Sequence, residues 1–188
     1  MNYLDASART RRQIFVAGTW NREKSAPFAS VSFELGKLIG AGGYDLSCGP
    51  GTGTAGHVVD GFRSIDSVGD VRFYLPEASL MEAVGERVER TPDDLVQTAL
   101  DYPMRNVYQI RQSDALIVVT GGDGALEEIL PALVDYSLPT ALLEGSGRAV
   151  EAIRVLADGF FPDWHSQLLF GRSAGEIYSW VHEELSSR

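Results

Sequence analysis

Two glycine-rich segments of the sequence have the composition of loops that bind phosphate. Residues 49–56 read GPGTGTAG and residues 120–128 read TGGDGALEE, and each segment follows an apolar run. Glycine lets backbone amides approach a phosphate with no Cβ in the way, and a helix after such a loop offers the positive end of its dipole. The residues that we expect to bind phosphate are Gly49, Gly51, Thr52, Gly53 and Thr54 in the first loop and Gly121, Gly122, Asp123, Gly124 and Ala125 in the second.

Two other interpretations of these glycines stay open. Glycine turns after strands also serve close packing between a strand and the helix that follows it. The first loop also contains Gly51-x-Gly53-x-x-Gly56, the spacing of dinucleotide-binding loops, and Glu77 lies about 20 residues beyond it. This motif follows the second predicted strand rather than the first, which argues against a dinucleotide.

The apolar runs and the turn residues between them predict alternating strands and helices. Residues 77–90 are charged and lack a clear period, so we expect a surface loop or a short helix there. Thr91-Pro92-Asp93-Asp94 has the pattern of a helix start, and Pro103 separates that helix from the next, which ends near Gln112. Further strands are expected at residues 14–18, 44–48, 70–75, 115–120, 139–143 and 167–170, and further helices at 27–41, 55–64, 124–136, 147–158 and 173–186.

This alternation predicts an α/β fold: a Rossmann-like parallel β-sheet flanked by helices on both faces. The chain has 188 residues and shows no internal repeat or linker, so we expect a single domain, with residues 1–12 flexible. In such sheets, ligands bind outside the carboxyl ends of the strands. We expect the two glycine loops to follow neighbouring strands and to share one site there.

Composition narrows the classes of protein and of partner. The formal charge of −10 argues against a nucleic-acid partner, and no apolar run is long enough for a membrane-spanning helix. The one cysteine, Cys48, leaves no internal disulfide and fits a reducing cytoplasm. The three histidines, His57, His165 and His182, lack the spacing of zinc ligands. We therefore expect a cytoplasmic protein with a small phosphorylated ligand, no metal and no cofactor.

Residues 104–128 resemble the signature of the LOG family, Rossmann-like cytokinin-activating phosphoribohydrolases that are often mislabelled lysine decarboxylases. That signature is an arginine on a helix, then Ser-Asp before an apolar strand, then Pro-Gly-Gly-x-Gly-Thr-x-x-Glu. Arg105, Ser113-Asp114 and the second glycine loop stand at this spacing. The resemblance extends over about residues 13–145 and includes Gly18 and Thr19, which follow the first strand and are further expected ligand-binding residues.

Four residues depart from the family pattern. Thr120 replaces the signature proline, and Ala125 replaces the threonine. Pro50 lies within the first glycine loop, and Asn106 follows the arginine where plant-type enzymes usually have lysine. The threonine hydroxyl is a group that could touch phosphate, so Ala125 lacks one phosphate contact that the family pattern offers.

The resemblance implies a hydrolase that cleaves the N-glycosidic bond of a nucleoside 5′-monophosphate to give the free base and ribose 5-phosphate. It assigns the catalytic roles to Glu128, which would stabilise an oxocarbenium-like ribose, and to Arg105, near the leaving base or the phosphate. We expect Glu128 in the first turn of its helix, where the dipole would keep it ionised. Each residue also has a purely structural interpretation. Glu128 would then be an ordinary acid in the first turn of a helix, and Arg105 would form a surface salt bridge. The family also implies a homodimer.

Other functions stay open beside this hydrolase. A protein of the same superfamily that binds or senses a nucleotide without turnover is the main alternative, and a transferase that moves the sugar is a variant. Decarboxylation of lysine would normally use a Schiff-base lysine with pyridoxal phosphate. Lys24 and Lys37 are the two lysines of the chain, and neither is expected to lie in a site.

Overall fold

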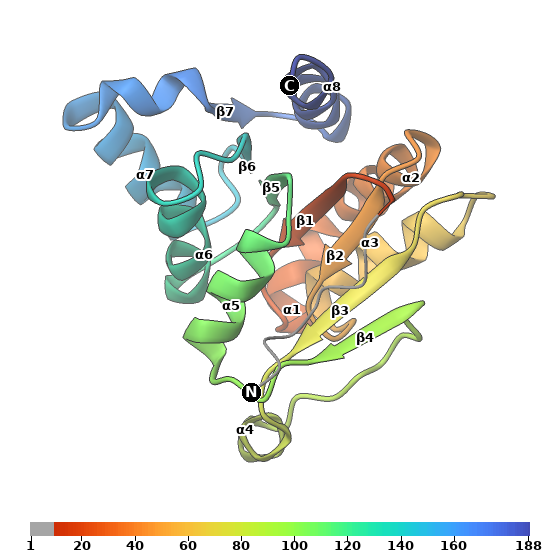
Figure 1. Cartoon of the computed structure of the whole chain (residues 1–188). Coiled ribbons are helices and arrows are strands. Elements are labelled where there is room, and N and C mark those ends of the chain that lie inside the picture. The colour runs from red at the N-terminus through yellow and green to blue at the C-terminus, as the bar shows by residue number, and fades with distance from the viewer. Residues whose placement is uncertain (1–9) are drawn as a thin grey trace.

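Seven parallel strands form one sheet in the computed structural model, which describes residues 10–188 (Figure 1). Their order across the sheet is β4-β3-β2-β1-β5-β6-β7. The strands are β1 (Gln13–Ala17), β2 (Asp45–Cys48), β3 (Val71–Leu75), β4 (Asp94–Gln97), β5 (Ala115–Val118), β6 (Thr140–Leu143) and β7 (Leu168–Gly171). The predicted α/β class with a parallel, Rossmann-like sheet is confirmed. The prediction of a flexible segment at residues 1–12 falls mainly outside the described residues.

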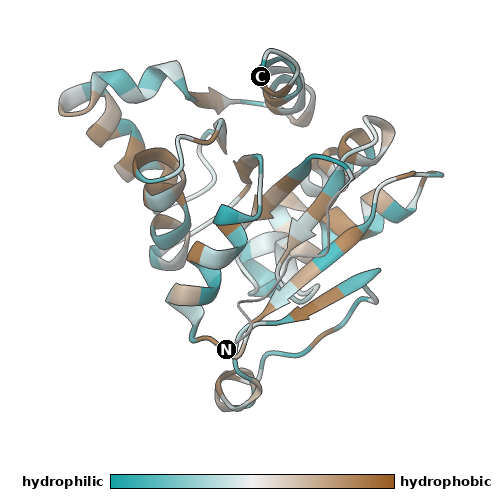
Figure 2. Cartoon of the chain, viewed as in Figure 1, coloured by the Kyte–Doolittle hydropathy of each residue, from teal (hydrophilic) through white to brown (hydrophobic). Residues whose placement is uncertain are grey.

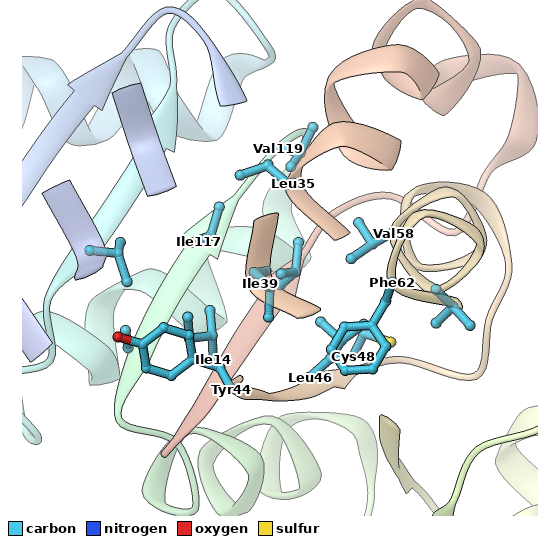
Figure 3. Close-up of a cluster of buried hydrophobic side chains, with 14 of the residues drawn as sticks. Ile14, Leu35, Ile39, Tyr44, Leu46, Cys48, Val58, Phe62, Ile117 and Val119 are labelled. Carbon is cyan, nitrogen blue, oxygen red and sulfur yellow. The ribbon is translucent and has the colours of Figure 1, made fainter. Parts of the chain in front are cut away.

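Helices cover both faces of the sheet, and each face has its own hydrophobic core. Residues of α2, α3 and α8 pack in the first core, and residues of α5, α6 and α7 in the second. In the first core, Ile14, Leu46 and Ile117 of the strands meet Leu35 and Phe62 of the helices (Figure 3). The helices are α1 (Arg22–Ser25), α2 (Ala29–Ala41), α3 (Gly53–Arg63), α4 (Ala78–Val84), α5 (Tyr102–Arg111), α6 (Asp123–Val134), α7 (Arg148–Gly159) and α8 (Ala174–Ser186), with 3-10 turns at Ala26–Phe28 and Pro162–Ser166.

The central strands are apolar because successive side chains enter opposite cores. In β1, Ile14 and Val16 belong to the first core, whereas Phe15 and Ala17 belong to the second. Hydrophobic residues accordingly recur along the strands, as the brown segments of Figure 2 show. In the part of the chain that the structure describes, no helix is long and apolar enough to cross a membrane.

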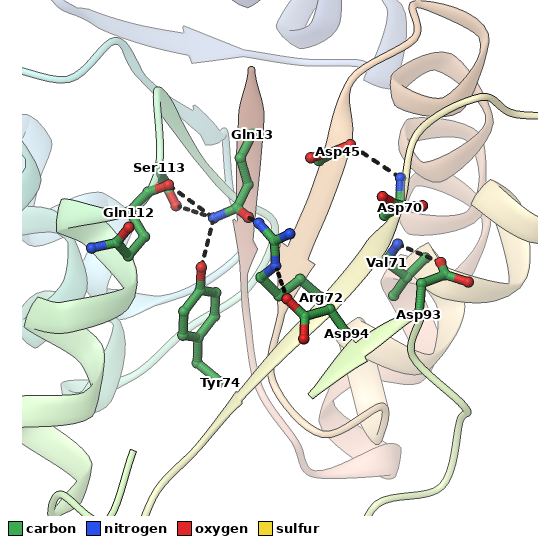
Figure 4. A network of polar contacts seen from close by, with 10 residues as sticks. All are labelled: Gln13, Asp45, Asp70, Val71, Arg72, Tyr74, Asp93, Asp94, Gln112 and Ser113. Carbon is green, nitrogen blue, oxygen red and sulfur yellow. Dashed lines mark hydrogen bonds and ion pairs between the residues drawn. The ribbon is translucent and has the colours of Figure 1, made fainter. Parts of the chain in front are cut away.

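The helix predicted from Thr91 is wrong, because the chain forms the edge strand β4 there, beside β3. The two acids that suggested a helix start serve the sheet instead. Asp93 accepts a hydrogen bond from the N–H of Val71 at 2.7 Å, and Asp94 accepts one from Nε of Arg72, also at 2.7 Å (Figure 4). Because Arg72 is almost buried, its pairing with Asp94 ties the edge strand to the sheet.

The order of the strands reverses beside β1. The chain adds β2, β3 and β4 on one side of β1, and then β5, β6 and β7 on the other. The prediction that the two glycine loops follow neighbouring strands is wrong, because β1 lies between β2 and β5. The loop after β1 therefore lies between the glycine loops. This reversal is the point of an open α/β sheet where ligands bind.

Candidate functional site

A cavity of about 930 Å³ opens at the carboxyl ends of the central strands. Its wall comes from the loops after β1, β2, β5 and β6, from α5 and α6, and from the segment that ends α4. The volume lies in the range of sites for small molecules and cofactors. The sequence-predicted residues that line the cavity are Gly18, Thr19, Gly49, Thr52, Arg105, Gly121, Gly122, Asp123, Gly124, Ala125 and Glu128.

The first glycine loop gives only part of its residues to the cavity wall. Gly51, Gly53 and Thr54 are not among the residues that line the cavity. Gly51 and Gly53 have φ angles of +88° and +54°, and a Cβ on Gly53 would stand 2.3 Å from the carbonyl oxygen of Thr19. The N–H of Thr54 donates to that same oxygen at 3.0 Å. Gly53 and Thr54 thus hold the loop against the loop after β1, which is the packing role that the sequence left open. A Cβ on Gly51 would instead meet Arg90.

The second glycine loop lines the cavity with all five of its predicted residues. Helix α6 begins at Asp123, and its N-cap, Gly122, has no side chain to cap the helix. Backbone N–H groups at this end are therefore available to an anion. Gly121 has to be a glycine, because a Cβ there would lie 2.3 Å from the Cβ of Ala125. The close packing of this loop thus brings the positive end of α6 to the cavity.

Thr120 joins this loop to the loop after β1. Its Oγ1 accepts a hydrogen bond from the N–H of Thr19 at 3.4 Å. A proline at position 120 would have no hydroxyl for this contact. The departure from the family signature therefore has a structural role between the two loops.

Arg105 is held in the cavity wall by a chain of buried polar side chains. Its Nη1 donates to Oε1 of Gln109 at 2.9 Å, and Nε2 of Gln109 donates to Oγ of Ser47 at 2.7 Å. The guanidinium carbon lies 5.7 Å from the centre of the Tyr102 ring. The residue is 6% exposed, so the alternative of a surface salt bridge does not apply. Arg105 lies in the first turns of α5, and the N-cap of this helix, Asp101, accepts a hydrogen bond from the N–H of Met104.

Glu128 also lines the cavity, one turn further along α6 than predicted. It is the sixth residue of a helix that begins at Asp123, so it lies in the second turn, away from the dipole's strongest effect. Burial raises the pKa of Glu128 to about 7, while the charge of Arg105 lowers it and that of Glu127 raises it. The prediction that the dipole keeps Glu128 ionised is therefore wrong, because burial outweighs the dipole and brings the pKa close to neutral pH.

Three polar atoms of lining residues are buried and have no hydrogen-bond partner among the described residues. They are Nε of Arg105, Oδ1 of Asn106 and Oγ1 of Thr52. A buried polar atom without a partner is costly, and it is rarely left so in a folded protein. A polar ligand in the cavity would supply partners for both donors and acceptors.

Several cavity residues were not found from the sequence. Glu86 and Tyr102 line the wall, and Oη of Tyr102 donates to Oε2 of Glu86 at 2.6 Å. Burial raises the pKa of Tyr102, and its hydrogen bond to Glu86 raises it further. Glu86 lies in the charged segment that the sequence assigned to a surface loop or short helix. No local pattern marked it, because its partner is 16 residues away.

Charged and aromatic residues at the loops complete the wall. Lys24 and Trp20 line the cavity, so the prediction that both lysines lie outside any site is wrong for Lys24. Arg148, the first residue of α7, also lines the cavity, and its Nη2 donates to Oδ2 of Asp123 at 2.8 Å. This ion pair is largely exposed and spans the loops after β5 and β6.

The remaining candidates from the sequence lie outside the cavity wall. Cys48 is fully buried at the end of β2, and burial raises the pKa of its thiol. His182 contacts the Tyr44 hydroxyl through Nδ1 at 2.7 Å, away from the cavity. A Cβ on Gly56, the last glycine of the dinucleotide-type spacing, would stand 2.8 Å from the carbonyl oxygen of Gly51, so this spacing serves packing within the loop. Across residues 10–188, no group of three or more His, Cys, Asp or Glu is placed to hold a metal ion.

Comparison with known proteins places these features in a wider group. The model of the SLOG cluster4 family (LDcluster4) matches residues 11–155. A curated protein of Oryza sativa subsp. japonica, named "Probable cytokinin riboside 5'-monophosphate phosphoribohydrolase LOGL9", is 29% identical over 187 residues. This match covers 94% of the present chain and 78% of the rice protein.

Solved structures share the fold over nearly the whole chain. The Moco carrier protein of Chlamydomonas reinhardtii superposes with a TM-score of 0.74 at 20% identity, covering 95% of this chain and 99% of that one. The molybdenum cofactor binding protein of Rippkaea orientalis gives a TM-score of 0.72 at 21% identity, with the same coverage of both chains.

Proposed function

Because the chain belongs to the SLOG cluster4 family, as its match over residues 11–155 shows, we propose that it is a nucleoside 5′-monophosphate phosphoribohydrolase. It would hydrolyse the N-glycosidic bond and release the free base and ribose 5-phosphate. One observation carries the proposal: Arg105, with an unpartnered Nε, and Glu128, with a pKa near 7, line the same cavity as the uncapped start of α6. The relative from rice, whose name includes this activity, supports it at 29% identity.

The phosphate of the substrate would bind at the second glycine loop. The N–H groups of Gly122, Asp123 and Gly124 stand at the start of α6, where the helix dipole favours negative charge. Oγ1 of Thr52 would add a donor from the first glycine loop. In the absence of the family's threonine hydroxyl, backbone groups carry most of this contact. The phosphate then fixes the ribose between the two loops.

Glu128 would act on the ribose and on the attacking water. In its ionised form it stabilises positive charge at C1′ and accepts a proton from the water whose oxygen bonds to C1′. The C1′–N bond breaks, and its electron pair leaves with the base. A pKa near 7 is well placed for a general base at neutral pH, because the carboxylate is both populated and basic.

Arg105 would stabilise the departing base. Its buried guanidinium keeps a free Nε, and a planar cation can donate to an atom that gains negative charge as the bond breaks. The contacts with Gln109 and Ser47 hold the guanidinium in place before the substrate arrives. This positioning requires no rearrangement during the reaction.

A second candidate is a protein that binds a phosphorylated small molecule without turnover. Ala125 favours it, because this residue removes a hydroxyl that the family signature provides at the phosphate site. Two structures of the same fold are described as a carrier and a binding protein of the molybdenum cofactor, so a cofactor of that kind is one ligand to test. A homodimer and a cytoplasmic location remain proposals that rest on the family resemblance.

Incubation with nucleoside 5′-monophosphates and the matching nucleosides, followed by chromatography of the released base, tests the proposal. Base release is expected from at least one monophosphate and from no nucleoside. Glu128→Gln should abolish it, Arg105→Ala should slow it strongly, and Glu151→Gln, a change at an acid on the exposed side of α7, should leave it unchanged. Tight binding of a monophosphate without any release would favour the binding protein.

A further inference from the structure

Glu86 presents a buried carboxylate to the cavity. The residue is 9% exposed and lines the wall together with Tyr102 and Arg105. Tyr102 is the one hydrogen-bond donor found for this carboxylate within residues 10–188, and it contacts Oε2 at 2.6 Å. Each carboxylate oxygen can accept more than one hydrogen bond. Glu86 therefore keeps acceptor capacity that faces a ligand.

The backbone fixes Glu86 in this position. Helix α4 ends at Val84 and is capped by Gly85, whose φ is +72°. The N–H of Glu86 then donates to the carbonyl of Met81 at 2.9 Å. A left-handed glycine followed by such a contact is a common way for a helix to end. Three residues later, the N–H of Glu89 donates to the carbonyl of Pro50 at 3.0 Å, which ties the segment to the first glycine loop.

Glu86 and the second glycine loop line the same cavity from different parts of the chain. Glu86 follows α4, which comes after β3, whereas the second glycine loop follows β5. The cavity of about 930 Å³ has room for a nucleoside monophosphate with its phosphate at α6 and its base near Glu86. The neighbouring Arg105 is then close to the base.

We propose that Glu86 selects a base with an amino group beside a ring N–H and a ring carbonyl, the edge that guanine carries. This inference rests on the proposed function, which places the phosphate at the second glycine loop. The ring N–H and the amino group are parallel donors in one plane, and a carboxylate accepts such a pair through its two oxygens, as it does from arginine. Tyr102 holds the carboxylate in place through Oε2.

Adenine does not match this carboxylate. Its corresponding ring nitrogen is an acceptor, so its lone pair would face the oxygens of Glu86, and the carboxylate would lose water without gaining a donor. Hypoxanthine keeps the ring N–H but lacks the amino group, so it offers one donor of the two. The three purines therefore rank guanine first, hypoxanthine second and adenine last. Pterins share the edge of guanine and are a second source of the same chemistry.

Equilibrium binding and base release with GMP, IMP, AMP and a pterin that carries a phosphate on its side chain test this inference. GMP is expected to bind about 10- to 100-fold more tightly than AMP, the discrimination typical of a paired contact to a base edge, with IMP between them. Glu86→Gln should remove most of this preference by weakening GMP while AMP stays unchanged, because the glutamine amide replaces one acceptor by a donor. Glu82→Gln, at an exposed acid on α4, is the matched control and should change neither.

The outcomes separate this inference from the proposed function. AMP binding as tightly as GMP, or an equal loss of both in Glu86→Gln, would overturn the base selection, while base release from either nucleotide would keep the hydrolase. Tight binding of the phosphorylated pterin alone, lost in Glu86→Gln, would support recognition of this edge and overturn the hydrolase. Binding of none of the four compounds would overturn both.

Discussion

Arg105 and Glu128 come from different helices and act on each other across one cavity. Burial raises the pKa of Glu128 to about 7, and the charge of Arg105 opposes that rise. If the carboxylate is the active form, activity falls as the pH drops through this pKa. Arg105→Lys keeps the positive charge, and Arg105→Gln removes it.

The first prediction concerns the pH dependence of base release. In the native chain the acid limb of kcat is expected near pH 7. In Arg105→Gln the limb should move to higher pH, because the opposing charge is gone, and in Arg105→Lys it should stay closer to its original position. Rates from pH 5 to pH 9 measure it. A limb that stays in place in Arg105→Gln would show that the two groups are not coupled.

The second prediction concerns stability. The pKa of Glu128 is raised in the folded chain above its usual 4.5, so folding is favoured at low pH, and this contribution is lost as the pH rises through about 7. The side chain in Glu128→Gln is neutral at every pH, so this variant does not lose stability as the pH rises through 7. At pH 8 the variant should be more stable than the native chain by roughly 1 to 3 kcal/mol. At pH 4 the difference should vanish, and urea unfolding at both pH values measures it.

The third prediction concerns the packing of the second glycine loop. Gly121→Ala places a Cβ 2.3 Å from the Cβ of Ala125, so the loop or the first turn of α6 has to shift. Overpacking of this kind costs about 1 to 3 kcal/mol. Gly124→Ala is the control, because nothing lies within 4 Å of its added Cβ, and it should not destabilise the chain. Equal unfolding midpoints for the two variants would contradict the packing argument.

The fourth prediction concerns the ion pair at the cavity. Asp123 places a negative charge at the start of α6 and accepts a hydrogen bond from Arg148 at 2.8 Å. Asp123→Asn removes this charge and frees Arg148 for an anion. Inorganic phosphate should then bind about 2- to 5-fold more tightly at low salt, with the gain shrinking as salt is added. Unchanged affinity, measured by titration calorimetry, would place the bound phosphate away from this helix end.

The sequence predicted those elements whose cause is local. The apolar run of β5 indicated a central strand because both of its faces are buried, and the glycines around 121–124 indicated a loop at its end. The error at β4 has a non-local cause. Asp93 and Asp94 have the pattern of a helix start, but their partners Val71 and Arg72 lie 22 residues away.

The same reasoning applies to the site. Arg105 and Glu128 were found through the spacing of a family signature, and both line the cavity. Glu86 carried no such signal, because the end of α4 and the hydroxyl of Tyr102 place it only once the chain has folded. Gly53 and Thr54 matched a phosphate loop by type, yet their neighbours in space are backbone atoms of the loop after β1.

Because Cys48 is buried, the rate at which a thiol reagent labels it reports how often the centre of the sheet opens. Thiol reagents attack the thiolate, and the only cysteine of the chain is fully enclosed at the end of β2, beside the first glycine loop. Its modification under native conditions therefore requires the centre of the sheet to open, and the labelling rate counts those openings. A ligand that bridges the two glycine loops would make these openings of the sheet less frequent. Slower labelling would thus reveal an occupied cavity even for a compound whose chemistry is unknown.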